Sequence, residues 1–200
     1  MDGRNAAVAA NRQAALDAAL DLVPEAGADG LTMQAVATRA GMSLRTLYNY
    51  FETKERLLAE VFAALVEFTK HEVELGGSPG ADARQRLEHF VTVHFDILDT
   101  QRRHMAALLS VRGVPQLEDR IRAIRTWRLR TLRELLRACG LGGSALDRAA
   151  AAAFALTTFT TYTALTEDLG LSQRDAIRTV SETLVRLTTP PARDTHDGLG

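Results

Sequence analysis

The stretch Leu31–Leu58, LTMQAVATRAGMSLRTLYNYFETKERLL, constrains the fold of this chain more than any other part of it. Thr32 is placed to cap a short helix. Gly41 is placed to end that helix, because glycine adopts the left-handed C-cap conformation without a steric penalty. Ser43 is placed to cap the next helix, Leu44–Phe51. The stretch therefore predicts two short helices joined by a glycine-containing turn.

The charges and aromatic side chains of this stretch suit a surface that binds a polyanion. Between residues 31 and 51 there are two arginines, Arg39 and Arg45, and no acidic residue, although the whole chain has a net charge of -1. Tyr48 and Tyr50 lie two residues apart on one predicted helix, so they point in different directions and cannot both be core residues. Their hydroxyls are suited to contacting phosphates. Because two helices meeting in this way present the second to the DNA major groove, we expect a DNA-binding helix-turn-helix.

Further residues at fixed spacing extend this pattern on both sides. They are Arg12–Leu20, Glu25, Gly27, Leu31-Thr32, Val36-Ala37, Ala40-Gly41, Ser43, Thr46-Leu47-Tyr48, Tyr50-Phe51, Lys54-Glu55 and Leu57. In these positions the chain resembles the DNA-binding domain of the TetR family of bacterial transcriptional regulators, over roughly residues 9–69. The resemblance implies an all-α homodimer whose helical C-terminal domain binds a small molecule.

The resemblance and helix geometry together predict the residues that contact DNA. Arg45 is suited to a bidentate contact with guanine, and Leu44 to covering a thymine methyl group. Arg45 replaces the small residue often found there in the family, so the resemblance implies no base preference. Capping is the alternative role of the hydroxyls of Thr32, Ser43 and Thr53. The predicted DNA-binding set is Thr32, Gln34, Ser43, Leu44, Arg45, Thr46, Tyr48, Asn49, Tyr50 and Lys54.

Composition favours an all-α chain with its own core. Hydrophobic residues make up 46% of the 200 residues, which is enough for an extended core. Aromatic residues make up only 6%, and this low share favours helix over sheet. Cys139 is the single cysteine, so no intramolecular disulfide forms and a reducing cytoplasm is the expected location. No signal peptide, membrane span or catalytic motif is evident. We expect a cytoplasmic protein that is not an enzyme and has no cofactor or metal.

Glycine and proline in residues 76–80 mark the clearest break in the chain. We expect a DNA-binding domain over residues 9–69, with the helix-turn-helix proper at 32–51, an effector-binding and dimerisation domain over 80–189, and a disordered tail at 190–200. Residues 1–8 are expected to be a mobile arm. About nine helices are predicted, over residues 9–26, 33–40, 44–51, 54–75, 82–100, 103–112, 116–139, 144–169 and 172–188.

Polar residues on apolar helix faces suggest where an effector binds. His94 is either a core histidine bonded to a backbone carbonyl or a polar contact in a pocket. Arg128 lies within an apolar stripe, so it requires an anion, from a structural carboxylate or from an acidic effector. Six threonines between residues 157 and 166 suit either close helix packing or a pocket wall. The predicted effector pocket is Phe90, His94, Leu98, Met105, Leu109, Trp127, Arg128, Phe154, Thr158 and Tyr162.

A dimer is expected on physical grounds, because one recognition helix reads too few bases for genomic selectivity. The expected interface is formed by the helices at 144–169 and 172–188, through Ile177, Val180, Leu184 and Leu187. The resemblance implies a repressor that releases double-stranded operator DNA when an unidentified small-molecule effector binds. No membrane partner is expected. The alternative is an all-helical small-molecule binding protein without an operator.

Overall fold

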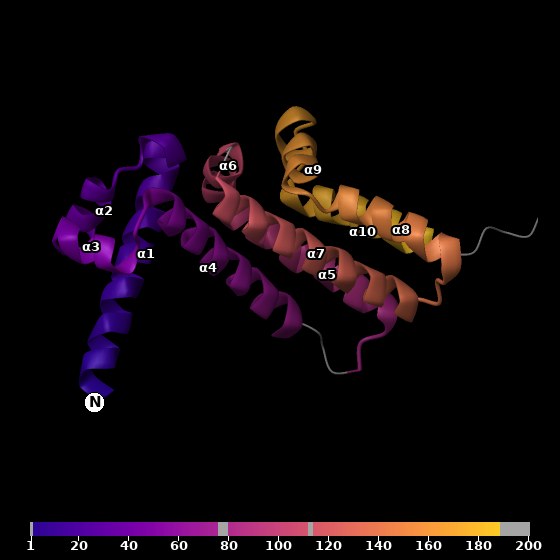
Figure 1. Cartoon of the computed structure of the whole chain (residues 1–200). Helices are drawn as coiled ribbons and strands as arrows, with labels where there is room; N and C mark the ends of the chain where they lie inside the picture. Colours follow the sequence, from indigo (N-terminus) through magenta and orange to yellow (C-terminus); the bar gives the residue numbers. More distant parts are fainter. Residues whose placement is uncertain (1, 76–79, 112–113, 189–200) are drawn as a thin grey trace, which may run out of the picture. The chain divides into compact units, whose positions relative to one another are not determined.

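The computed structural model describes residues 2–75, 80–111 and 114–188, and in these ranges it contains helices and no strand (Figure 1). The all-α prediction is therefore confirmed. Among the described residues, no helix is both long enough and apolar enough to cross a membrane. The helices are α1 (Asp2–Gly30), α2 (Met33–Arg39), α3 (Leu44–Tyr50), α4 (Lys54–Leu75), α5 (Ala83–Thr100), α6 (Arg102–Ser110), α7 (Pro115–Ala138), α8 (Gly143–Leu156), α9 (Phe159–Thr163), the π-helix η1 (Ala164–Asp168) and α10 (Gln173–Leu187).

The chain forms two compact units whose boundary falls within α5 and α7. Unit 1 comprises Met1–Leu75 and Asp96–Trp127, and unit 2 comprises Gly76–Phe95 and Arg128–Gly200. This division differs from the expected boundary at residues 70–80. The reason is that α6 packs against α1, and Leu108 of α6 is fully buried in the same hydrophobic core as the N-terminal helices.

The first helix is longer than predicted. It begins at Asp2 rather than at residue 9, so the expected mobile arm at residues 1–8 is wrong from residue 2 onward. The alanine-rich sequence there has high helix propensity, and this continues the helix toward the N-terminus. The helix contains Pro24 and is interrupted at Gly27, where φ is 68° and ψ is 165°, before a last helical segment runs to Gly30.

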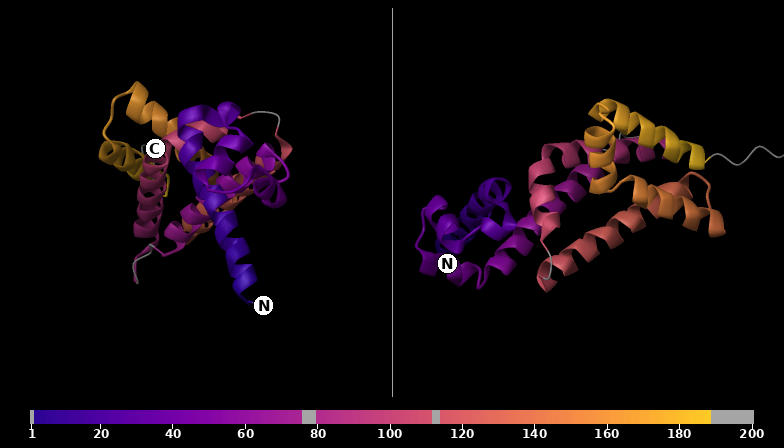
Figure 2. Two further views of the ribbon diagram at one scale, coloured as in Figure 1. Left: turned by 90° about the vertical axis from the view of Figure 1, so that its left-hand side faces the viewer. Right: turned by 90° about the horizontal axis from the view of Figure 1, so that it is seen from above.

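The core of unit 1 is built by α1, α2, α3 and α4 together with α6 and the start of α7. The helix α1 contacts α2, α4 and α6, while its N-terminal end projects away from the other helices of this unit (Figure 2). Short alanine side chains on α1 allow close approach of these neighbours. The fully buried residues of the core are Ala15, Ala19, Val23, Val36, Ala37, Leu47, Leu57, Val61 and Leu108.

Unit 2 corrects the prediction of one long helix over residues 144–169. That segment forms α8, then a break at Thr157 and Thr158, then α9 and η1, while α8 and α10 lie side by side (Figure 1). The Thr157 hydroxyl donates to the Ala153 carbonyl, and the Thr158 hydroxyl accepts from the Thr161 amide to cap α9. Threonine hydroxyls compete with helical backbone bonds in this way, which explains the break.

Two predictions fall on residues outside the described ranges. The expected disordered tail at 190–200 lies beyond residue 188, where the description ends. Most of the predicted break at 76–80 also lies outside the described residues.

Candidate nucleic-acid interface and effector region

Both short helices of the predicted helix-turn-helix begin with a side-chain cap. The Thr32 hydroxyl accepts from the Ala35 amide at 3.1 Å, and the Ser43 hydroxyl accepts from the Thr46 amide at 3.1 Å. Oγ of Ser43 also lies 2.8 Å from Oγ1 of Thr46. The capping role considered for these hydroxyls is therefore confirmed, and it fixes where α2 and α3 start.

The turn between α2 and α3 is a Schellman motif. The Met42 amide donates to the Ala37 carbonyl at 3.0 Å, and the Gly41 amide donates to the Thr38 carbonyl at 3.2 Å. These two bonds require a left-handed residue between the helix and the turn, and Gly41 supplies it with φ of 67°. The predicted role of Gly41 is confirmed, and the geometry of the turn fixes how α3 leaves α2.

One side of α3 is anchored in the core and the other is exposed. Leu47 is fully buried, whereas Arg45 and Asn49 are exposed and Tyr48 retains 46% of its accessible surface. Tyr50 is half-buried against the core of unit 1, so the two tyrosines do point in different directions, as predicted. In the rest of the predicted DNA-binding set, Thr32, Gln34 and Ser43 are exposed, while Leu44, Thr46 and Lys54 are half-buried.

Lys54 has a role that the sequence did not indicate. Its ammonium donates to the carbonyls of Ala28 at 3.3 Å and Asp29 at 3.1 Å. A cation beside the carbonyl end of a helix is favourable because those carbonyls carry partial negative charge. Lys54 thus joins the start of α4 to the end of α1, on either side of α2 and α3 in the sequence.

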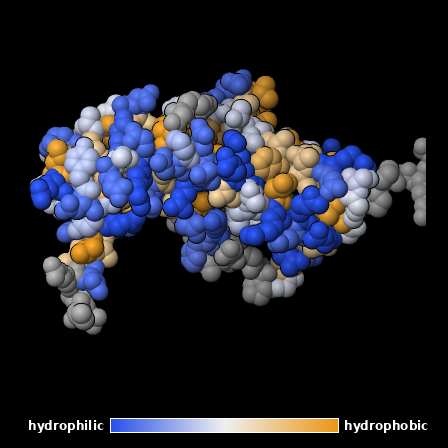
Figure 3. Space-filling view, in the orientation of Figure 1, coloured by the Kyte–Doolittle hydropathy of each residue, from blue (hydrophilic) through white to orange (hydrophobic). Residues whose placement is uncertain are grey.

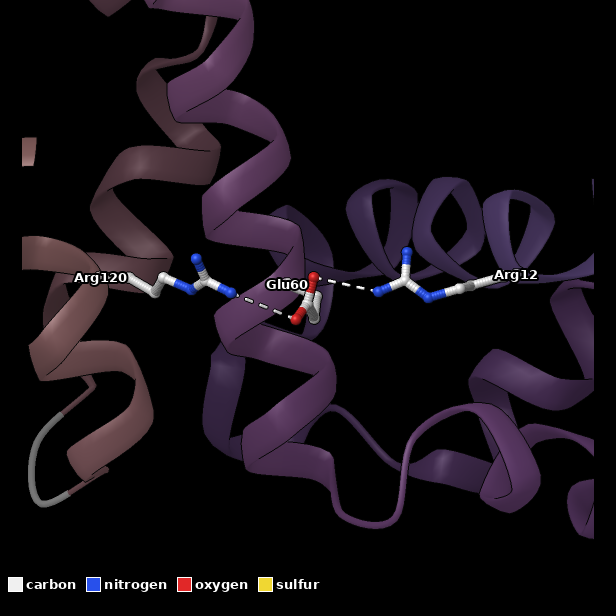
Figure 4. Close-up of polar contacts among 3 residues, drawn as sticks. All are labelled: Arg12, Glu60 and Arg120. Carbon is white, nitrogen blue, oxygen red and sulfur yellow. Dashed lines mark hydrogen bonds and ion pairs between the residues drawn. The ribbon is translucent and has the colours of Figure 1, made fainter. Parts of the chain in front are cut away.

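A carboxylate on α4 joins three helices of unit 1 (Figure 4). Glu60 accepts from Arg12 of α1 at 3.1 Å and from Arg120 of α7 at 3.4 Å. Arg12 also lies over the ring of Phe51, 5.2 Å from its centroid. Sequence reasoning missed this cluster because its members are 48 and 60 residues apart, beyond any local pattern.

The predicted effector pocket is divided between the two units. Leu98, Met105, Leu109 and Trp127 belong to unit 1. The other residues belong to unit 2, where several of them meet around one backbone carbonyl. They are Phe90, His94, Arg128, Phe154, Thr158 and Tyr162.

His94 makes the backbone contact expected of a core histidine. It is 6% exposed, it stacks on Phe90 with ring centroids 5.5 Å apart, and its Nε2 lies 2.9 Å from the Thr157 carbonyl oxygen. Since a carbonyl only accepts, Nε2 carries the hydrogen. Burial, and secondarily the charge of Arg128, lower the pKa of His94 to about 3, so the imidazole is neutral at physiological pH.

Arg128 shares the same acceptor. Its Nη1 donates to the Thr157 carbonyl at 3.3 Å, and its guanidinium carbon lies 4.2 Å from the ring centroid of Phe154. The sequence suggested a carboxylate or an effector as the partner of this half-buried charge. The structure adds a carbonyl and an aromatic face, both of which stabilise a guanidinium. The helix break at Thr157 is therefore held by donors from α5 and α7.

The predicted dimer stripe on α10 needs a correction. Val180 is 2% exposed and Leu184 is 0% exposed within the single chain, so they are core residues of unit 2 and are unavailable to a partner. The helix α10 packs against α8 and η1 of the same chain, and this stripe is buried in that packing. Ile177 is half-buried and Leu187 is 37% exposed, so these two keep accessible surface.

A sequence model described as "Bacterial regulatory proteins, tetR family" matches residues 15–61, which contain the C-terminal half of α1, all of α2 and α3, and the start of α4. Over these residues the chain matches the TetR family. The match covers the capped helices, the turn at Gly41 and the exposed face of α3. The resemblance drawn from the sequence is therefore confirmed.

Regulators with curated descriptions are among the relatives of this chain. It is 27% identical over 125 residues to the HTH-type transcriptional regulator BetI of Rhizobium meliloti, covering 62% of each chain. It is 35% identical over 77 residues to the HTH-type transcriptional repressor KstR of Rhodococcus jostii, covering 38% of this chain and 35% of that one. The alignments thus span less than two thirds of the length of these relatives.

Solved structures share the fold of this chain over most of its length. A transcriptional regulator from Rhodococcus sp. Rha1 has a TM-score of 0.74 at 20% identity, covering 88% of this chain and 95% of that one. FadR from Bacillus subtilis, solved in complex with stearoyl-CoA, has a TM-score of 0.68 at 23% identity, covering 86% and 97%. At these identities the likeness shows the fold.

Proposed function

We propose that this chain is a ligand-responsive transcriptional repressor that binds double-stranded operator DNA as a homodimer. The observation that carries the proposal is the construction of α3. Caps and a Schellman turn fix its ends, Leu47 anchors it, and Arg45, Tyr48 and Asn49 lie on its exposed side. A short, rigidly held helix of this kind is suited to the major groove.

Within this proposal, different side chains read bases and contact the backbone. Arg45 lies in the first turn of α3 and contacts guanine, and Gln34 in the first turn of α2 contacts a second base. Tyr48, Tyr50 and Lys54 contact phosphates, which fix the register without reading sequence. Lys54 has a third N–H beyond the two that serve the carbonyls of α1.

The effector is proposed to bind among α5, α7 and the α8–α9 break in unit 2. Here His94 and Arg128 both bond to the Thr157 carbonyl, so one polar cluster ties three segments of the chain together. A ligand that competes for these donors alters the packing of the helices that carry them. The naming of KstR as a repressor and the ligand bound to Bacillus subtilis FadR support a ligand-controlled repressor.

The proposed dimer uses the outer faces of α8 and α10. Ala151 and Ala155 of α8 are exposed, and Leu187 of α10 keeps accessible surface. Apolar surface is visible over the region of α8 in Figure 3. Small side chains on an exposed helix face suit close packing against a second copy.

Footprinting on the DNA upstream of the chain's own gene tests the proposal. We expect two protected half-sites whose centres lie about 34–36 Å, one helical turn, apart. Addition of cognate effector is expected to remove the protection. Arg122→Ala, an exposed arginine of α7, is the control for loss of positive charge. Absence of sequence-specific protection at low salt would favour the alternative of a small-molecule binding protein without an operator.

A further inference from the structure

Pro24 leaves a carbonyl of α1 without its usual partner. In a regular helix the amide of residue 24 would donate to the carbonyl of Leu20, four residues earlier. Proline has no N–H, and its ring also presses against that carbonyl and bends the helix. Gly27 then interrupts α1 with φ of 68°. The end of α1 is therefore a bent segment that needs hydrogen bonds from elsewhere.

Side chains of α6 supply these bonds. Nε2 of His104 lies 3.0 Å from the Leu20 carbonyl oxygen, and Nη2 of Arg103 donates to the Pro24 carbonyl at 3.4 Å. Because the Leu20 carbonyl only accepts, Nε2 of His104 carries the hydrogen. Nδ1 of His104 is buried and has no hydrogen-bond partner among the described residues. The imidazole thus contributes one hydrogen bond, directed at the carbonyl that Pro24 leaves open.

The bent segment of α1 sets where the helix-turn-helix begins. After Gly27, Ala28 and Leu31 are each 2% exposed in the core of unit 1, and α2 starts two residues after Leu31. Lys54 holds the carbonyls of Ala28 and Asp29 from the other end of the helix-turn-helix. A change in the direction of this segment therefore moves the start of α2.

We propose that His104 is a positioning residue for operator binding, and that its imidazole replaces the hydrogen bond that Pro24 withholds from Leu20. It holds the bend of α1 in the orientation that places α2 and α3 on DNA. This inference rests on the proposed function, and it adds a residue of α6 that touches neither DNA nor effector in that scheme.

A double-mutant cycle tests the replacement directly. Pro24→Ala restores a backbone N–H that can donate to the Leu20 carbonyl, which makes the His104 bond redundant. We expect His104→Ala to weaken operator binding about five- to tenfold, the equivalent of one hydrogen bond. In the Pro24→Ala background the same change should weaken binding less than about twofold. Equal losses in both backgrounds, or no loss in either, would overturn the inference.

Two further variants separate positioning from general damage. His104→Gln keeps an N–H donor and should retain part of the affinity, whereas His71→Ala, which removes an exposed histidine of α4, should leave binding unchanged. Equal losses in His104→Gln and His104→Ala would contradict a role based on the donor.

Hydrogen–deuterium exchange gives a readout that does not need DNA. His104→Ala should speed exchange of the amides of residues 28–36, and Pro24→Ala should suppress this effect. A wild-type chain that binds no operator but shows this coupling would refute the proposed function while supporting the claim that the His104 bond holds the bend of α1. Unchanged exchange in His104→Ala would refute the positioning role itself.

Discussion

At the scale of single residues, burial decides the charge state of His94. Burial, and secondarily the charge of Arg128, lower the pKa of His94 and favour a neutral imidazole, although the hydrogen bond to the Thr157 carbonyl acts in the opposite direction. A second proton on His94 would be buried next to a guanidinium. Mild acid therefore protonates His94 only in the unfolded chain, and in this way it favours unfolding.

The lowered pKa of His94 predicts a loss of stability in acid. The group has a pKa of about 3 when folded and 6.5 when unfolded, so below pH 6.5 the unfolded chain binds more protons. Stability contributed by neutral His94 is complete above pH 6.5 and falls as the pH drops toward 3. When the pH is lowered from 7 to 5, protonation of this one group should decrease the free energy of unfolding by about 2 kcal/mol.

Urea unfolding at both pH values measures this effect. His94→Gln replaces the titrating group by an amide that can still donate to Thr157, so its stability should vary less between the two pH values. An identical pH dependence in wild type and variant would contradict the lowered pKa.

Arg45 is the residue expected to set base preference. Arg45→Ala should relax selectivity at one base pair in each half-site, with a loss of about 1–3 kcal/mol of discrimination if the contact is bidentate to guanine. Selection from a randomised operator library measures it. Tyr50→Phe provides the comparison, because loss of a phosphate contact should weaken binding to all sequences alike. A uniform loss for Arg45→Ala would assign this side chain to the DNA backbone.

At the scale of elements, short helices are held by their ends. In α2 and α3, which are seven residues long, the N-caps and the Gly41 turn supply hydrogen bonds to backbone amides and carbonyls that have no partner within the helix. In the α8–α9 segment, threonine hydroxyls take the same role and divide what would otherwise be one helix. End interactions therefore decide the number of helices more than propensity does.

Gly41→Ala tests the cost of the turn at this scale. The new Cβ would meet no heavy atom within 4 Å, so any loss comes from the left-handed backbone. We expect a loss of about 1–2 kcal/mol in urea unfolding. Gly30→Ala is the control, since its φ lies outside the left-handed range and a new Cβ would meet only the Cβ of Ala26, at 3.6 Å. Comparable losses at both positions would show that the turn is not strained.

At the scale of the whole molecule, the buried and exposed faces of unit 2 decide how two copies can meet. Val180 and Leu184 are buried in the core of their own chain. The exposed face of α8 must therefore supply much of the proposed interface. A charged substitution at a buried position of unit 2 should therefore prevent folding, whereas one on the exposed face of α8 should prevent only dimerisation.

Charges on the exposed face of α8 should separate the protomers. Ala151→Glu with Ala155→Glu should give a folded monomer with greatly weakened operator binding, while Ala123→Glu on α7 should remain dimeric. Leu184→Glu should instead unfold unit 2, because an unpaired charge would be buried. Sedimentation equilibrium and thermal melting measure both effects. A monomeric wild-type chain, or a dimeric double variant, would exclude this interface.

The sequence by itself determined the features that depend on neighbours along the chain. The caps at Thr32 and Ser43 and the turn at Gly41 use bonds between residues three to five apart, so chain connectivity brings the partners together. The family pattern in α1 to α4 and the all-α fold followed from the same local regularities. Arg45 and Tyr48 were placed on the exposed side of α3 by helical spacing alone.

Tertiary structure alone decided which distant residues meet and which faces are covered. His104 meets Leu20 across 84 residues and His94 meets Thr157 across 63, pairings that no local spacing encodes. An apolar stripe such as that of α10 looks the same in sequence whether it faces its own chain or a second copy. Its burial depends on how other elements of the same chain, among them α8 and η1, pack against it, and that packing is a sum over many non-local contacts.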